Sequence, residues 1–125
     1  MIYLQLIIQI MKKPRFKPNE SYLHLHAKRV LTSWLAYDYI RIVEEEKFCI
    51  GGCIWFTPDL SCYNEKGLAD IYEIVNTNDV DVFKQWRINL YLELHKWDVN
   101  VYTIDANWIM RQTAPPQSIN MLKIL

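Results

Sequence analysis

The chain has 125 residues, which is the usual size of a single domain. Its residues are 51% hydrophobic and 22% charged, so there is enough apolar surface to exclude disorder along the whole chain. Fourteen basic side chains balance fourteen acidic ones. This zero net charge excludes a protein coated in positive charge, although not a local basic patch.

Residues 1–18 form an N-terminal extension in two parts. Residues 1–10 are apolar but too short to cross a bilayer, which takes about 20 residues. Four basic residues then alternate with prolines, which keep the segment extended: Lys12, Lys13, Arg15 and Lys17. We interpret the basic part either as a solubilising tail or as an arm that contacts phosphates.

A single domain is predicted over residues 19–112, and a C-terminal tail over residues 113–125. Asn19 is a favourable N-cap residue, and a helix is predicted over about 20–36. Apolar residues recur in it at steps of three and four: Leu23, Ala27, Val30, Leu31, Trp34 and Leu35.

Strands are predicted next. Alternating and β-branched residues indicate a strand over 39–43 and a second over 49–56, in which Gly51 and Gly52 indicate a bulge or a close backbone approach. The acidic run 44–46 between them is expected at a hairpin turn or an exposed edge. Turn-forming residues then predict a loop over 61–68, with Asn64 and Gly67 at its turns.

A third strand is expected over 70–76 and a fourth over 99–104, with a helix over 80–97 between them. That helix places apolar residues at core spacing: Val82, Phe83, Trp86, Leu90, Leu94 and Trp97. A short helix is predicted over 106–111. The order α-β-β-β-α-β predicts an α/β fold, with a mixed sheet flanked by helices. We interpret the five tryptophans as packing residues rather than as base-stacking platforms.

Three cysteines, Cys49, Cys53 and Cys62, cannot all pair within one chain. Their spacing lacks the tight pair that is typical of zinc sites, so we interpret them as free thiols that act as small buried hydrophobic residues. No secretory leader precedes them, and we expect a reducing, cytoplasmic setting without membrane association.

Two carboxylates are candidates for chemistry. Asp59 follows the second predicted strand, and Glu73 lies in the third among apolar residues. A carboxylate inside a strand core is costly unless it is paired or binds a cation. Two acids converging from adjacent strands, with a backbone carbonyl and waters, would make an oxygen site for Mg²⁺. The alternative is that Glu73 faces solvent and Asp59 caps a turn.

The pieces Pro58-Asp59 and Glu73-Ile74-Val75 resemble the PD-(D/E)XK nuclease signature, and the predicted element order resembles that superfamily's restriction-endonuclease-like core over about residues 19–105. The His24-x3-Lys28 pair is similar to that of the competence-protein CoiA-like nucleases and their small phage relatives. The resemblance implies Asp59 and Glu73 as ligands of Mg²⁺ or Mn²⁺, and a DNA-cleaving activity.

The signature's lysine is replaced here by Val75, which can polarise neither water nor phosphate. Some members of the superfamily supply the missing group from the following helix, which implies Lys84 or Gln85. Resolvase-like members add an acidic residue of the first helix, which implies Glu20. If neither Lys84 nor Gln85 reaches the site, the domain binds without cutting.

The first helix offers further groups. Glu20, His24 and Lys28 fall on one stripe of this helix. His24 and Lys28 are candidates to contact a phosphate. The alternative is that they belong to an ordinary solvated helix face. His26 and His95 are expected at the surface. Asp70 competes with Asp59, but three residues along a strand place it on the face opposite Glu73.

The leading hypothesis is a metal-dependent DNA endonuclease or resolvase-like phosphodiester hydrolase. Its partner would be DNA, bound in part by the basic residues between 12 and 29, and a homodimer is a further expectation. The alternative is a catalytically inactive module with the nuclease fold that binds nucleic acid or a protein partner. A small interaction protein without a site is the third reading.

Overall fold

A computed structural model of the protein describes residues 21–76 and 81–112. The predicted extension 1–18, with Lys12, Lys13, Arg15 and Lys17, lies outside these residues, as do Glu20, the expected cap Asn19 and the tail 113–125. Among the described helices, none has the length and apolar character that crossing a membrane requires.

The first described helix, α2 (Tyr22–Leu35), lies inside the predicted range 20–36. The side chain of Ser21 caps it by accepting a hydrogen bond from the backbone N–H of His24 at 3.1 Å. The predicted apolar stripe faces the core, where Ala27 and Leu31 are fully buried.

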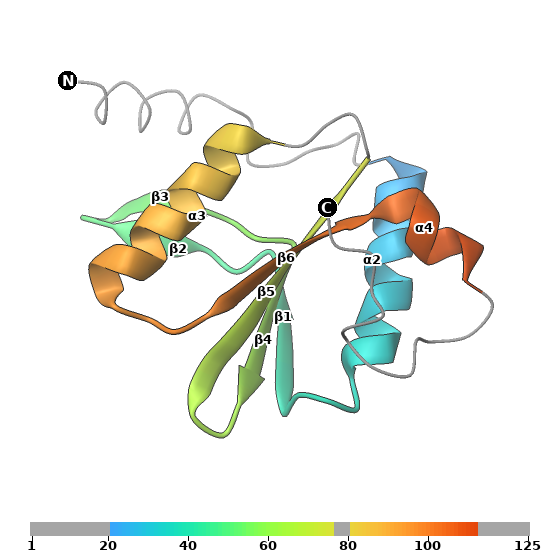
Figure 1. Cartoon of the computed structure of the whole chain (residues 1–125), viewed down its shortest axis with the longest axis horizontal. Helices are drawn as coiled ribbons and strands as arrows, with labels where there is room; N and C mark the ends of the chain where they lie inside the picture. The colour runs from blue at the N-terminus through green and yellow to red at the C-terminus, as the bar shows by residue number, and fades with distance from the viewer. Residues whose placement is uncertain (1–20, 77–80, 113–125) are drawn as a thin grey trace.

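Four strands form a mixed sheet in the order β1-β4-β5-β6 (Figure 1). They are β1 (Arg41–Glu44), β4 (Leu60–Asn64), β5 (Gly67–Val75) and β6 (Asn100–Asp105). The pairs β1·β4 and β4·β5 are antiparallel, whereas β5 and β6 are parallel and are connected through helix α3 (Val82–His95). The predicted mixed sheet flanked by helices is therefore confirmed.

The single strand predicted over 49–56 is wrong, because this segment forms a hairpin of β2 (Phe48–Ile50) and β3 (Cys53–Phe56). Gly51 and Gly52 make its turn, with φ of +57° and +81°. Two consecutive residues with positive φ suit a two-residue hairpin turn, so the glycines reverse the chain instead of bulging it. The hairpin forms a separate two-stranded sheet.

The loop predicted over 61–68 is also wrong. Only residues 65–66 form a turn; residues 61–64 lie in β4 and 67–68 in β5, with Asn64 and Gly67 as the last pair of that ladder. The small and polar residues Ser61 and Cys62 favour a loop locally, but both are fully buried in the sheet. Tertiary packing here overrides local propensity.

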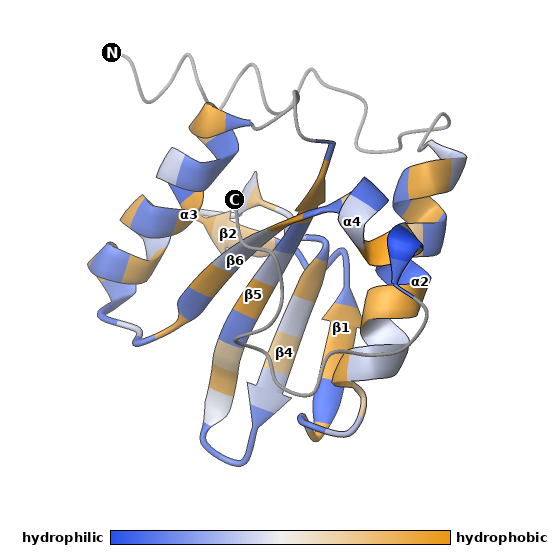
Figure 2. Ribbon diagram, turned by 45° about the vertical axis from the view of Figure 1, so that its right-hand side comes forward, coloured by the Kyte–Doolittle hydropathy of each residue, from blue (hydrophilic) through white to orange (hydrophobic). Residues whose placement is uncertain are grey.

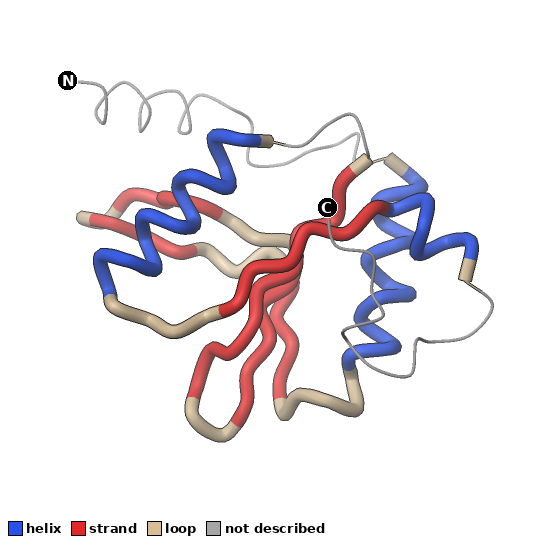
Figure 3. Tube along the Cα trace, viewed as in Figure 1, coloured by secondary structure: helices blue, strands red, loops and turns tan. Residues whose placement is uncertain are grey.

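Helices cover both faces of the sheet, and Figure 3 shows α2 and α4 (Ala106–Arg111) on one side with α3 and the hairpin on the other. Hydrophobic and hydrophilic residues alternate along the strands (Figure 2), which supplies an apolar face to each side. On the α2 side the core includes Leu31, Leu60, Tyr72, Ile74 and Ile104. On the α3 side it includes Phe48, Trp55, Phe56, Ile71 and Ile88.

Helix α3 buries a different face from the one predicted. Its buried residues are Ile88, Tyr91 and Leu92. Most of the expected core stripe is exposed, namely Val82, Phe83, Trp86, Leu94 and, beyond the helix, Trp97. The reason is that the first turn of α3 points Lys84 and Gln85 toward polar groups of the sheet.

Candidate functional site

Asp59 and Glu73 lie side by side at one end of the sheet. Asp59 directly precedes β4, and the antiparallel pairing of Leu60 with Tyr72 brings it next to Glu73 on β5. Both residues are buried, at 6% and 5% exposure. Glu73 therefore does not face solvent, and the two carboxylates form the centre of the candidate site.

Backbone hydrogen bonds hold the two carboxylates in place reciprocally. Asp59 Oδ2 accepts from the backbone N–H of Ile74 at 2.7 Å, and Glu73 Oε1 accepts from the backbone N–H of Asp59 at 3.3 Å. Each side chain thus binds the strand that carries the other. This arrangement fixes both groups before any ligand binds.

His24 reaches the pair from helix α2. Its Nε2 atom lies 3.3 Å from Asp59 Oδ1 and 3.0 Å from the carbonyl oxygen of Ile74. Because a carbonyl oxygen only accepts hydrogen bonds, Nε2 carries the proton in this arrangement. Helix α2 thereby places a donor on the Asp59 side of the site.

Lys84 reaches the pair from helix α3, where its Nζ atom lies 2.8 Å from Glu73 Oε2. Its backbone N–H donates to the side chain of Asp81, the N-cap of the helix, at 2.9 Å. The helix start therefore fixes Lys84 over the sheet. An amine is present beside Glu73 although Val75 stands where the nuclease signature has lysine.

The two carboxyl groups have opposite pKa shifts. Burial and the charge of Asp59 raise the pKa of Glu73 to about 7. Burial also acts to raise the pKa of Asp59, but the hydrogen bond from His24 and the charge of Lys84 hold it below its ordinary value. Burial acts to lower the pKa of Lys84, whereas Glu73 and Asp59 raise it above the ordinary value. The pair therefore favours a nearby positive charge.

Gln85 points beyond the carboxylates, and its side-chain amide donates to Thr103 Oγ1 at 3.2 Å. Thr103 is buried on β6 and lies beside Glu73 in the parallel register. Of the two candidates to replace the missing lysine, Lys84 contacts Glu73 and Gln85 contacts Thr103.

Lys28 lies on α2 one helical turn after His24, but it does not present its charge to solvent. The residue is 3% exposed, and its Nζ atom lies 3.1 Å from Glu45 Oε1. Glu45 follows β1, and its backbone N–H donates to the carbonyl oxygen of Asp59 at 3.2 Å. Sequence reasoning missed Glu45 as a site residue, because no local spacing connects it to Lys28.

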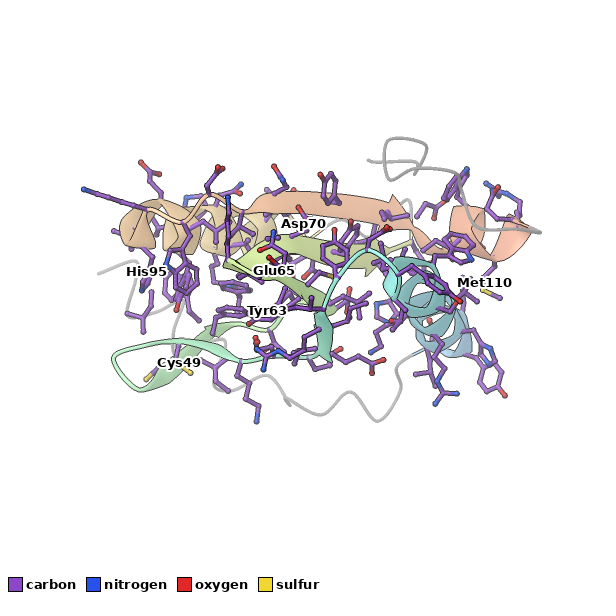
Figure 4. The ribbon with its side chains drawn as sticks, turned by 90° about the horizontal axis from the view of Figure 1, so that it is seen from below. Cys49, Tyr63, Glu65, Asp70, His95 and Met110 are labelled. Atoms are coloured by element: carbon purple, nitrogen blue, oxygen red, sulfur yellow. The ribbon has the colours of Figure 1, made fainter. Side chains whose placement is uncertain are left out.

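Other candidate residues lie elsewhere. Asp70 accepts hydrogen bonds from Tyr39 and, at 3.0 Å, from Asn100, and Figure 4 shows it on the sheet. His26 lies against the ring of Tyr22 on α2, and His95 stacks on Tyr91 at the end of α3. None of these three residues joins Asp59 and Glu73.

The cysteines divide by exposure. All three are free thiols, as expected, but only Cys62 is buried. Cys49 is exposed near the tip of the hairpin (Figure 4), so the expectation that it packs in the core is wrong. Side chains alternate along β2, so Phe48 and Ile50 face the core while Cys49 between them faces outward.

The donor set at the candidate site fits a hard divalent cation. Among the described residues, each carboxylate oxygen of Asp59 and Glu73 has one protein partner and a second lone pair, and the carbonyl oxygen of Ile74 lies beside them. Mg²⁺ prefers carboxylate, carbonyl and water oxygens. In the described part of the chain no three His, Cys, Asp or Glu side chains form a metal cluster, so waters would complete the coordination.

Comparison with known proteins finds no similar family or structure. No protein-family model, no curated protein and no solved structure matches the chain.

Proposed function

We propose that the protein is a Mg²⁺- or Mn²⁺-dependent phosphodiester hydrolase acting on DNA. The observation that carries this proposal is the convergence of His24 on α2, Asp59 just before β4, Glu73 on β5 and Lys84 on α3. Buried acids, a lysine and a histidine at one end of a sheet combine a cation-binding group with donors for a phosphate.

The arrangement of the elements supports the resemblance to the PD-(D/E)XK superfamily. Without the hairpin, the order α2-β1-β4-β5-α3-β6 has the pattern α-β-β-β-α-β. This pattern supports the proposal that Asp59 and Glu73 are the metal ligands that the resemblance implies. The hairpin is an insertion between β1 and β4 in this comparison.

The proposed mechanism assigns a role to each side chain. Asp59 and Glu73 would hold the cation, which when bound lowers the pKa of water and offsets charge on the scissile phosphate. Lys84, already beside Glu73, would donate to a non-bridging phosphate oxygen or to the attacking water. His24 keeps Asp59 oriented through its Nε2–H group.

The alternative function is a binding module that has lost catalysis, and Val75 favours it. Lys84 is held in an ion pair with Glu73, and in this alternative that pair only stabilises the fold. The two functions differ in whether DNA is cut once the cation is supplied.

The test incubates the full chain with labelled linear, single-stranded and branched DNA, in Mg²⁺, in Mn²⁺ and with a chelator. We expect cutting that needs the metal, and a loss of roughly 100-fold or more in rate for Glu73→Ala and for Lys84→Ala. Matched controls are Asp98→Ala and Lys66→Ala, which alter exposed side chains and should keep the rate.

Two results would reject the hydrolase. Binding without cutting under either metal would favour the inactive module. Cutting that survives in both Glu73→Ala and Lys84→Ala would show that another protein, or another site, is responsible.

A further inference from the structure

The ion pair between Lys28 and Glu45 is unusual because its two members differ in exposure. The side chain of Lys28 is 3% exposed, whereas that of Glu45 is 50% exposed. The carboxylate therefore lies on the solvent side of the ammonium group. An anion arriving from solvent would meet Glu45 before it could contact Lys28.

This pair borders the candidate site. Glu45 donates its backbone N–H to the carbonyl oxygen of Asp59, and Lys28 follows His24 by one turn of α2. The charge of Glu45 also contributes to the raised pKa of Lys84. A DNA backbone that places one phosphate group near Asp59 and Glu73 would thus pass close to Lys28.

The carboxylate of Glu45 can leave without disturbing the carboxylates of the site. Its backbone is held by the bond to Asp59 and has a left-handed φ of 52°, but its side chain is long and half exposed. If Glu45 leaves, the buried ammonium of Lys28 loses one anionic partner, which costs free energy. A phosphate oxygen is negatively charged, as a carboxylate oxygen is, and can therefore take the place of Glu45 as a partner of Lys28.

We propose that Glu45 stands in for a phosphate on Lys28, and that a phosphate group of the substrate displaces it when the substrate binds. The inference rests on the proposed function, which supplies the phosphodiester. Lys28 is then a substrate-binding residue that Glu45 occupies in the free protein. Glu45 competes with the substrate phosphate and so lowers the affinity for DNA.

The test compares Glu45→Gln with Glu44→Gln, which makes the same change of charge one residue earlier, at an exposed position on β1. Binding of a labelled DNA duplex is measured in chelator, so that no cutting occurs, over a range of salt. We expect Glu45→Gln to bind about fivefold tighter than both the unchanged protein and Glu44→Gln. Its salt dependence should be steeper by roughly one released counterion, because Lys28 then gains a phosphate contact.

Lys28 must account for the gain. The double variant Lys28→Gln, Glu45→Gln is expected to lose the tighter binding. If Glu45→Gln does not fold, as judged by circular dichroism, Glu45→Asn replaces it, since asparagine tolerates the left-handed backbone at this position. Equal DNA affinities for the Glu45 and Glu44 variants would overturn the inference that a phosphate of DNA displaces Glu45.

A second arm uses inorganic phosphate and measures the thermal midpoint. A larger rise for Glu45→Gln than for Glu44→Gln supports a phosphate site on Lys28, and without a gain for DNA it assigns the site to free phosphate. If the Glu45 and Glu44 variants behave alike in both arms, the phosphate site on Lys28 is overturned as well. Tighter DNA binding by Glu45→Gln without metal-dependent cutting would reject the hydrolase and keep the phosphate site.

Discussion

Glu73 is a carboxyl group buried beside a second one, and this surrounding raises its pKa from 4.5 to about 7. Between these two values the folded protein binds more protons at Glu73 than the unfolded chain does. Stability contributed by this residue is therefore present below pH 4.5 and is lost as the pH rises through 7. The lowered pKa of Asp59 acts in a more acidic range, below its ordinary 3.8.

Replacing Glu73 by glutamine should remove this loss. We expect Glu73→Gln to have a flatter dependence of its unfolding free energy on pH, between pH 5 and pH 8, than the unchanged protein. Urea unfolding at pH 5 and at pH 8 measures the two free energies, and Glu93→Gln, which alters an exposed side chain, is the control. An equally steep fall in Glu73→Gln would mean that other groups cause the pH dependence.

The thiols allow a second prediction at this scale. Burial raises the pKa of Cys62 to about 12, whereas Cys49 is exposed. Because the thiolate is the reactive form, we expect a thiol reagent at pH 8 to modify Cys49 rapidly and Cys62 only after unfolding. Mass spectrometry of peptides after timed reaction distinguishes the sites, and rapid labelling of Cys62 in the native protein would contradict its burial.

Sequence reasoning named most of the residues that the structure brings together, and the reason differs from residue to residue. Asp59 and Glu73 were indicated by the cost of burying acids in strands and by a short signature. Lys84 was one of two candidates, because sequence spacing does not say which side of a helix faces the sheet. Glu45 was missed because its contact with Lys28 exists only after β1 and α2 pack together.

At the scale of elements, the hairpin of β2 and β3 depends on its two glycines. Gly51 and Gly52 have φ of +57° and +81°, and L residues with a branched side chain are strained there. We expect Gly52→Val to destabilise the protein by about 1–2 kcal/mol, and Gly51→Asn to be nearly neutral because asparagine tolerates this conformation. Thermal or urea unfolding measures both, and similar effects of the two substitutions would contradict the turn geometry.

Prediction from sequence succeeded best for elements with a strong period and failed where packing decides. Helix α2 has one apolar stripe, and both its range and its buried face agree with the expectation. In α3 the aromatic and apolar residues are spread around the helix, so the pattern could not choose the buried face. A pair of glycines can form either a hairpin turn or a bulge. Here the pairing of Ile50 with Cys53 shows that Gly51 and Gly52 form the turn.

At the scale of the whole molecule, one sheet separates two apolar cores. Leu31 is fully buried between α2 and the sheet, and Ile88 is fully buried between α3 and the sheet. We expect Leu31→Ala and Ile88→Ala each to cost about 2–5 kcal/mol, and each to lower the midpoint of one common unfolding transition because both cores share β5. Unfolding followed by tryptophan fluorescence and by circular dichroism tests this. Separate transitions by the two probes would show that the faces unfold independently.

Residues 46–58, which include the hairpin, leave the four-stranded sheet after β1 and return to it at β4. The backbone hydrogen bond from Glu45 to Asp59 joins the two ends of this segment. For the dynamics of the molecule this lets the tip of the hairpin at Gly51 and Gly52 fray, while Phe48, Trp55 and Phe56 hold the rest of it in the core. The amide of Glu45 should then exchange with solvent deuterium as slowly as amides of β4 and β5, while the amides of Gly51 and Gly52 exchange quickly. Fraying of the tip would leave the carboxylates of Asp59 and Glu73 in register.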